Sequence, residues 1–329
     1  MGIDFSKMTD KKKKEVYAKI DCTFIDSNLI RRTYHPITNR DSYNSFMLSE
    51  TKEPNKPDTA DYTGKRELLK KIFKITDTSA FDAAYQQATS GNGQEGTRIS
   101  VMHSSALCAL LCFYRVSEEN PIIINGVDYD KVHFEVQNDV FNTPSNIDIA
   151  LLSSKEKNIL FLEPKFSEYL SSGKYKCSIK YKRKYDTLRL KDIGYDYRED
   201  DDKGKIILSK GKNEFYIEGI KQMLSHYIGV ERFCELKHTK NEELTLPVGY
   251  KVLLGEILFN AWSNQYSSFK NYSEEYKELA KHLNKQNNCF FMLENTLTYQ
   301  DVFINYPLEP RIKKYYRLQF LTRESIEPL

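Results

Sequence analysis

The chain has 329 residues, and its 49 Lys and Arg residues almost balance its 46 Asp and Glu residues, for a formal net charge of +3. Hydrophobic residues make up 40% and charged residues 29%, a composition of globular proteins that argues against intrinsic disorder. Because the overall field is weak, a nucleic-acid partner would have to be held by a local basic patch.

The cysteines and the apolar segments bear on the cellular compartment. Six cysteines are scattered through the chain without a Cys-x-x-Cys pair, which suggests reduced, buried thiols. No apolar run approaches the length that a membrane span needs. The sequence therefore predicts a cytoplasmic protein without a membrane partner, long enough for one large domain or two ordinary ones.

The first hundred residues predict a mainly helical segment. Residues 1–60 are polar, and apolar spacing then favours helices over Arg66–Ile75 and Phe81–Ala88. The next helix, 103–116, is apolar almost all round, as expected of a helix buried on several sides. His103 at its start is open to three roles, a helix cap, a phosphate contact or a structural histidine, and the last is favoured.

A strand with one polar face follows this helix. Over Lys131–Gln137 the apolar side chains Val132, Phe134 and Val136 alternate with polar ones that include Glu135. This alternation predicts a strand with the three apolar side chains on one face of a sheet and Glu135 on the other.

Residues 146–166 predict an antiparallel hairpin with its turn at Ser153–Lys157. Successive side chains point to opposite faces, so Glu163 and Lys165 are neighbours on one face, and Asp148 lies near them on the preceding strand. Two carboxylates and an ammonium are costly to gather on an apolar hairpin unless something compensates the charge. A divalent metal ion would do so.

The segment after the hairpin is strongly basic and contains interleaved tyrosines. A surface that tracks a nucleic-acid backbone needs this mixture, and Lys182, Arg183 and Lys184 are its densest part. A solvated, disordered insertion explains the composition equally well. The basic residues are Lys174, Lys176, Lys180, Lys182, Arg183, Lys184, Arg189 and Lys191.

An amphipathic helix over Glu214–Leu236 and an apolar strand over Gly249–Phe259 come next. On the helix, Gln222 and His226 lie opposite the apolar stripe, at 100° per residue. From Tyr272 onward, helical and strand-like pieces alternate.

The order helix, three-strand meander, helix, strand resembles the core of the PD-(D/E)XK nuclease superfamily, and the His-Ser-Ser opening of the first helix resembles a branch of restriction endonucleases. In this resemblance Asp148 matches the metal-binding aspartate, Glu163 and Lys165 the Glu-x-Lys pair, Glu135 an additional acidic position and Gln222 a glutamine of the second helix. A lone Glu-x-Lys means little, since roughly seven acid-x-base triplets are expected by chance in such a chain. This triplet gains weight from its setting, since it lies on an apolar strand and follows a strand that begins with an aspartate. A buried helix precedes these strands and an amphipathic helix follows them.

The resemblance implies an α/β fold with a restriction-endonuclease-like core, a mixed central β-sheet flanked by helices. The core would span 97–262, with a helical N-terminal elaboration at 1–96 and an α/β C-terminal elaboration at 263–329 packed on it. The implied activity is that of an endonuclease that hydrolyses phosphodiester bonds of DNA with Mg²⁺ or Mn²⁺, as restriction enzymes do.

The resemblance also assigns roles. Asp148 and Glu163 would hold the metal, assisted by Glu135 and by the backbone carbonyl of Pro164. Lys165 would orient the attacking water and offset negative charge, and Gln222 would position it. Pro164 departs from a regular strand, and a local bulge is expected there.

Several alternatives stay open at this point. The acidic and basic residues of the hairpin would also suit a structural ion pair. The same fold would serve a non-catalytic DNA-binding or complex-forming protein. The sequence does not distinguish DNA from RNA as the substrate, and it leaves the oligomeric state open, a homodimer included.

Overall fold

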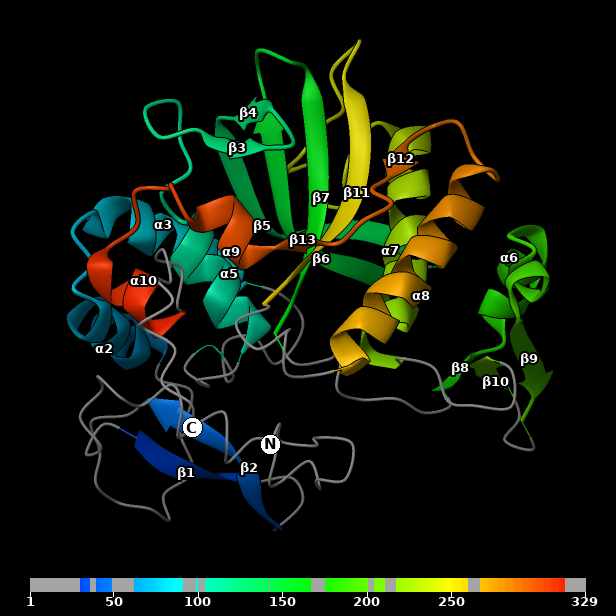
Figure 1. Ribbon diagram of the computed structural model, residues 1–329, viewed down its shortest axis with the longest axis horizontal. Helices are drawn as coiled ribbons and strands as arrows, with labels where there is room; N and C mark the ends of the chain where they lie inside the picture. The colour runs from blue at the N-terminus through cyan, green and yellow to red at the C-terminus, as the bar shows by residue number, and fades with distance from the viewer. Residues whose placement is uncertain are drawn as a thin grey trace.

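The computed structural model describes residues 30–35, 40–48, 62–90, 99, 104–141, 143–166, 175–200, 204–210, 217–259 and 267–316. A mixed sheet of six strands lies at the centre, with the order β12-β11-β7-β6-β5 and β13 as a further partner of β11 (Figure 1). The first three strands of the chain in this sheet form an antiparallel meander, and β11 runs parallel to β7. The strands are β5 (Lys131–Val140), β6 (Thr143–Ser153), β7 (Asn158–Lys165), β11 (Lys251–Leu258), β12 (Phe291–Met292) and β13 (Leu297–Thr298).

Helices from both ends of the chain cover one face of this sheet (Figure 1). The glutamate Glu309 ties these distant parts together, because it accepts hydrogen bonds from Thr76 Oγ1, at 3.1 Å, and from the Tyr114 hydroxyl. The helices are α2 (Tyr62–Phe73), α3 (Thr78–Ala88), α5 (Ser105–Phe113), α9 (Tyr299–Phe303) and α10 (Pro310–Tyr315).

The helix α5 is the buried core helix that its apolar sequence predicted, since its residues from Leu107 to Phe113 are all buried. It begins at Ser105, two residues later than expected. Its N-cap is Ser104, whose side chain accepts a hydrogen bond from the Leu107 backbone N–H at 3.2 Å. His103 lies outside the described residues.

The opposite face is covered by α7 (Ile217–Leu236) and α8 (Ser267–Asn284) (Figure 1). The basic segment belongs to a small unit that joins the same apolar core through Tyr185, Leu188 and Leu190. The described part of this segment is therefore folded, and its interpretation as a disordered insertion is wrong. The unit consists of β8 (Tyr175–Ser178), α6 (Lys180–Thr187), the 3₁₀ helix η5 (Leu190–Ile193), β9 (Tyr195–Glu199) and β10 (Lys205–Lys210).

The terminal segments differ in how well the sequence predicted them. The N-terminal part, expected to be helical, also contains the antiparallel pair β1 (Ile30–His35) and β2 (Arg40–Leu48), which its polar composition did not predict. A second small pair, β3 (Ile122–Ile124) and β4 (Val127–Tyr129), precedes the meander. The C-terminal part is mixed α/β, as expected, and it supplies two strands to the central sheet.

In two strands of the meander, β5 and β6, the side chains switch the face of the sheet toward which they point. Phe134 packs in the core under α5, but Val136 packs in the core under α7, so the expectation that they share a face is wrong. The residue between them, Glu135, has a left-handed backbone with φ of 52°, which interrupts the regular alternation. The paired strand does the same, because Ile147 and Ile149 belong to different cores. The alternation of side chains between the two faces of the sheet is therefore interrupted at the same level in both strands.

Pro164 sits in β7 without the expected bulge toward β11, because the register with β11 continues through it. The pairing of β7 with β6, by contrast, ends at Leu162. The Lys165 carbonyl accepts a hydrogen bond from Phe259 N–H at 2.8 Å, on the side of the last residues of β11. Neighbouring residues of a strand direct their backbone groups to opposite sides, so Pro164 faces the β6 side, beyond the last paired residue, and interrupts no ladder.

Two glycines allow α7 to lie close to its neighbours. A Cβ at Gly219 would lie 1.7 Å from the Tyr272 hydroxyl oxygen, and one at Gly229 would lie 3.1 Å from Asn138 Cβ and 3.2 Å from Ser145 Cβ. The Tyr272 hydroxyl in turn lies 2.6 and 2.8 Å from the two carboxylate oxygens of Glu256 on β11. Gly219 therefore makes room for the ring that reaches this buried carboxylate.

We expect Gly219→Ala to lower the free energy of unfolding by about 2 kcal/mol, because the added methyl group overpacks a filled site. In an ordinary helix interior the same substitution would raise stability by about 1 kcal/mol. Urea denaturation measures the difference. Gly229→Ala on the same helix is the matched control and should cost less, since its nearest contacts are looser. Equal stability of Gly219→Ala and the parent would contradict this packing.

Candidate active site

The site is centred on a buried ion pair on the α7 side of β7. Lys165 Nζ lies 2.5 Å from Glu163 Oε1, and each side chain is 2% exposed. The sequence had predicted these two side chains as neighbours on one face, with Phe161 on the same face, and this is confirmed. Two buried charges need close pairing and further hydrogen bonds to offset the loss of hydration.

The helix α7 supplies a partner to each member of the pair. Gln222 Oε1 accepts a hydrogen bond from Lys165 Nζ at 2.6 Å. His226, one turn further along, brings Nε2 to 2.9 Å from Glu163 Oε2. Residues four apart share a helix face, so the two side chains lie over the ion pair together.

The histidine has a second contact on β6. Ser145 Oγ lies 2.9 Å from His226 Nδ1, and both side chains are buried. Successive contacts thus link five side chains on α7, β7 and β6, in the order Gln222, Lys165, Glu163, His226 and Ser145.

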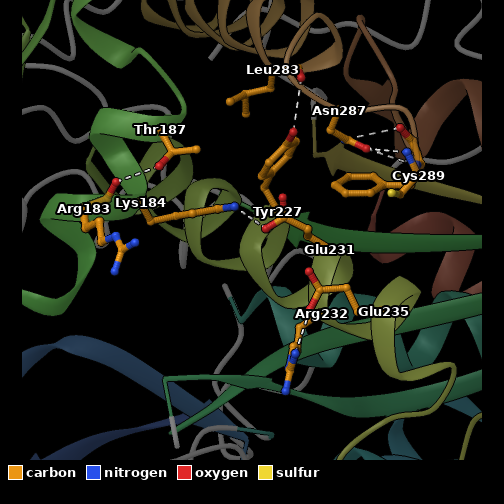
Figure 2. Close-up of polar contacts among 11 residues, drawn as sticks. Arg183, Lys184, Thr187, Tyr227, Glu231, Arg232, Glu235, Leu283, Asn287 and Cys289 are labelled. Atoms are coloured by element: carbon orange, nitrogen blue, oxygen red, sulfur yellow. Dashed lines mark hydrogen bonds and ion pairs between the residues drawn. The ribbon is translucent and has the colours of Figure 1, made fainter.

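The sequence placed both Gln222 and His226 opposite the apolar stripe, and it predicted no role for His226. The reason is that α7 is buried on more than one side. The apolar residues Leu224 and Tyr227 of α7 pack in the core. There the Tyr227 hydroxyl donates a hydrogen bond to the Leu283 carbonyl of α8 at 3.2 Å (Figure 2). The polar stripe meanwhile faces the sheet. The four-residue spacing of Gln222 and His226, together with Gly229 three residues later, is the signal that could have indicated this.

The pair sets the ionisation of Glu163. Burial alone would raise the pKa of its carboxyl group, but the charge of Lys165 and that of protonated His226 outweigh burial and lower the pKa to about 2. The carboxylate is therefore the form that the folded chain holds at neutral pH.

Asp148 is half-buried and follows the last paired residue between β6 and β7, the pair Ile149 and Leu162. Continuing this register puts it beside Glu163. Its neighbours on β6, Ile147 and Ile149, belong to different cores. Asp148 thus stands where β6 turns over between the two faces.

Carboxylates occupy the same level of four adjacent strands. Glu135 falls between the pairs that flank Asp148, and Glu256 is the register partner of Glu163. The sequence predicted the first three acids, Glu135, Asp148 and Glu163, but not Glu256. A single acid inside the apolar strand that precedes Phe259 is the signal that was available for it.

We tested whether these groups suit a hard cation. In the described parts of the chain, no three His, Cys, Asp or Glu side chains converge as a metal site. Mg²⁺, however, is usually bound through one or two carboxylates and several waters. Glu163 Oε2 is buried without a good hydrogen bond, and Pro164 directs its carbonyl toward the β6 side, where Asp148 lies. These oxygen donors fit Mg²⁺ in kind.

Ser145, His226 and Glu163 are also the residue types of a hydrolase triad. The Ser145 side chain is 5% exposed and packs against the close approach of Gly229. Here, however, Ser145 contacts Nδ1 and Glu163 faces Nε2, the reverse of the triad, in which the serine contacts Nε2 and the acid contacts Nδ1.

The basic residues of α6 take part in ion pairs within the chain. Lys182 Nζ lies 2.7 Å from Glu199 Oε1, and Lys184 binds Glu231 of α7. Arg183 between them is exposed and points away from the Lys184–Glu231 pair (Figure 2). Two of the three predicted phosphate-binding cations thus already contact carboxylates.

No protein-family model matches the chain, and neither a curated protein nor a solved structure matches it. Among the described helices, none combines the length and the apolar character that a membrane crossing requires.

We expect Glu163→Gln to lower stability by about 3 kcal/mol at pH 7, because it leaves the Lys165 ammonium buried without its carboxylate. The folded-state pKa of about 2 lies below the ordinary glutamate value of 4.5, so the stabilisation is present above pH 4.5 and is lost as the pH falls toward 2. The difference in free energy of unfolding between parent and variant, measured by denaturant titration, should therefore become smaller as the pH falls from 4.5 toward 2.

The exposed pair of Glu199 and Lys182 provides the control. Glu199→Gln should change stability little, because solvent already screens this pair. A Glu163→Gln variant as stable as the parent at pH 7 would show that the buried pair does not stabilise the fold.

Proposed function

We propose that the chain is a metal-dependent endonuclease that hydrolyses phosphodiester bonds of DNA on a core of the PD-(D/E)XK type. The observation that carries this proposal is the buried Glu163–Lys165 pair, held by Gln222 and adjacent in register to Asp148. The arrangement of a three-strand meander, a following helix and a parallel fourth strand supports the same class.

The oxygen ligands in this proposal are the carboxylates of Asp148 and Glu163, with the backbone carbonyl of Pro164. Glu135, at the same level of the neighbouring strand, reaches the site directly or through water. A bound Mg²⁺ or Mn²⁺ would lower the pKa of a water molecule and stabilise negative charge on the phosphate oxygens.

Lys165 has the chemistry to orient the attacking water and to offset negative charge that develops on the phosphate. Its ammonium is held from two sides, by Glu163 and by the Gln222 side-chain oxygen, so its direction is restricted before substrate binds. Gln222 is accordingly a positioning residue in this proposal.

A second candidate function, a non-catalytic DNA-binding or complex-forming protein, is favoured by one observation. The Glu163 charge is already balanced by Lys165 and faced by His226, so the group is stable without a metal ion. Such a protein would retard DNA on a gel and leave it intact.

Cleavage of supercoiled plasmid separates the two functions. We expect the parent to nick or linearise plasmid with Mg²⁺ or Mn²⁺ and not with EDTA. Asp148→Asn and Glu163→Gln should reduce the rate at least about a hundredfold, because each removes a charged metal ligand. Glu235→Gln, which removes an exposed carboxylate paired with Arg232, should cleave as the parent does. Retarded but uncut DNA with either metal would favour the second candidate, and an RNA substrate of the same sequence distinguishes the nucleic acid.

Binding of DNA through α6 predicts a particular salt dependence. In Arg183→Ala, the plot of the logarithm of the DNA-binding constant against log salt concentration should become less steep by about one unit of slope, because one phosphate contact is lost. Lys182→Ala and Lys184→Ala should lower it less, since both lysines already contact carboxylates. Arg232→Ala on α7, an exposed arginine paired with Glu235 (Figure 2), is the control. An unchanged slope in a variant with Lys182, Arg183 and Lys184 all replaced by alanine would remove this segment from the DNA interface.

A further inference from the structure

Two buried polar atoms face each other beside the ion pair. Glu163 Oε2 and His226 Nε2 lie 2.9 Å apart, and neither meets the geometry of a hydrogen bond with any described residue. Buried polar groups are nearly always paired, so each of these atoms depends on the other.

The contact with Ser145 is compatible with two proton arrangements of the imidazole in which a donor faces Glu163. If the Ser145 hydroxyl donates to Nδ1, the neutral ring carries its proton on Nε2, toward Glu163. If the ring is protonated, both nitrogens donate, and the hydroxyl accepts. In both states a N–H group points at the Glu163 carboxylate, whereas the opposite tautomer would direct a lone pair at a negative charge.

The backbone fixes the position of this ring. Gly229, three residues after His226, brings α7 so close to β5 and β6 that an added Cβ would press on Asn138 and Ser145. Because the helix cannot retreat without losing this packing, the imidazole stays between β6 and β7.

The contacts divide the Glu163 carboxylate between two supports. Lys165, itself held by Gln222, binds Oε1, while His226, itself held by Ser145, faces Oε2. A carboxylate contacted at only one oxygen can rotate about its last bond. Contact at both oxygens fixes its plane.

We propose that His226 and Ser145 are positioning residues that hold the Glu163 carboxylate in one orientation and thereby set the affinity of the site for Mg²⁺. This inference rests on the proposed function. Partners that orient a metal-binding side chain typically change metal affinity or activity 10- to 100-fold when they are removed. Neither residue contacts the reacting phosphate in this proposal.

The experiment measures Mg²⁺ binding to the intact protein by calorimetry, and plasmid cleavage as a function of Mg²⁺ concentration. His226→Leu should weaken Mg²⁺ binding about 10- to 100-fold. Its cleavage rate should recover as Mg²⁺ is raised. His226→Gln, which keeps a donor near Nε2, should restore part of the affinity, and it carries the test if the leucine variant does not fold.

Matched controls come from the same chain. His282 is also a buried histidine, and its Nε2 lies 2.7 Å from the Leu188 carbonyl oxygen, away from the site. His282→Leu should lower stability and leave Mg²⁺ affinity unchanged. Ser153 is buried at the other end of β6, where its hydroxyl donates to Glu156, so Ser153→Ala is the control for Ser145→Ala.

A double-mutant cycle tests whether Ser145 acts through His226. Ser145→Ala should weaken Mg²⁺ binding in the parent but cause no further loss in a His226→Leu background. Equal Mg²⁺ affinities of His226→Leu and His282→Leu, or fully additive losses in the cycle, would overturn the inference alone. A parent protein that neither binds Mg²⁺ nor cleaves DNA would overturn the proposed function, and the inference with it.

Discussion

The burial of one carboxylate and one ammonium on β7 constrains everything around the site. Neither charge is tolerated in an apolar interior without close partners, so a polar helix face has to cover them. The helix α7 meets this demand with Gln222 over Lys165 and His226 over Glu163. Gly229 serves the same end, because it lets the helix approach β5 and β6 closely.

The second constraint is the change of face in β5 and β6. It places Asp148 between Ile147 and Ile149, which belong to different cores, at the level of Glu163. The left-handed backbone at Glu135 is unfavourable by roughly 1–2 kcal/mol for a residue with a side chain. Strained positions of this kind cluster at functional sites, and here the strain lies at the level of the sheet where the carboxylates gather.

Much of this architecture could be predicted from local patterns. The alternation along β7, the turn after Ser153 and the all-round apolar α5 follow from the period of their side chains, and the structure confirms them. The contacts of Gln222 and His226 could not be predicted in this way, because both faces of α7 are buried. The pattern of apolar residues along a helix indicates only the more apolar of two buried faces. The turnover at Glu135 depends on a single backbone angle, which no residue pattern specifies.

The link between Thr76 and Glu309 bears on how the chain acquires its fold during synthesis. These residues are 233 positions apart, yet they share a hydrogen bond beneath the same face of the sheet. The strands that complete β11 on its open side also come from beyond residue 290. The ribosome must therefore release nearly the whole of the described chain before this core can close, and until then β11 presents an unpaired edge.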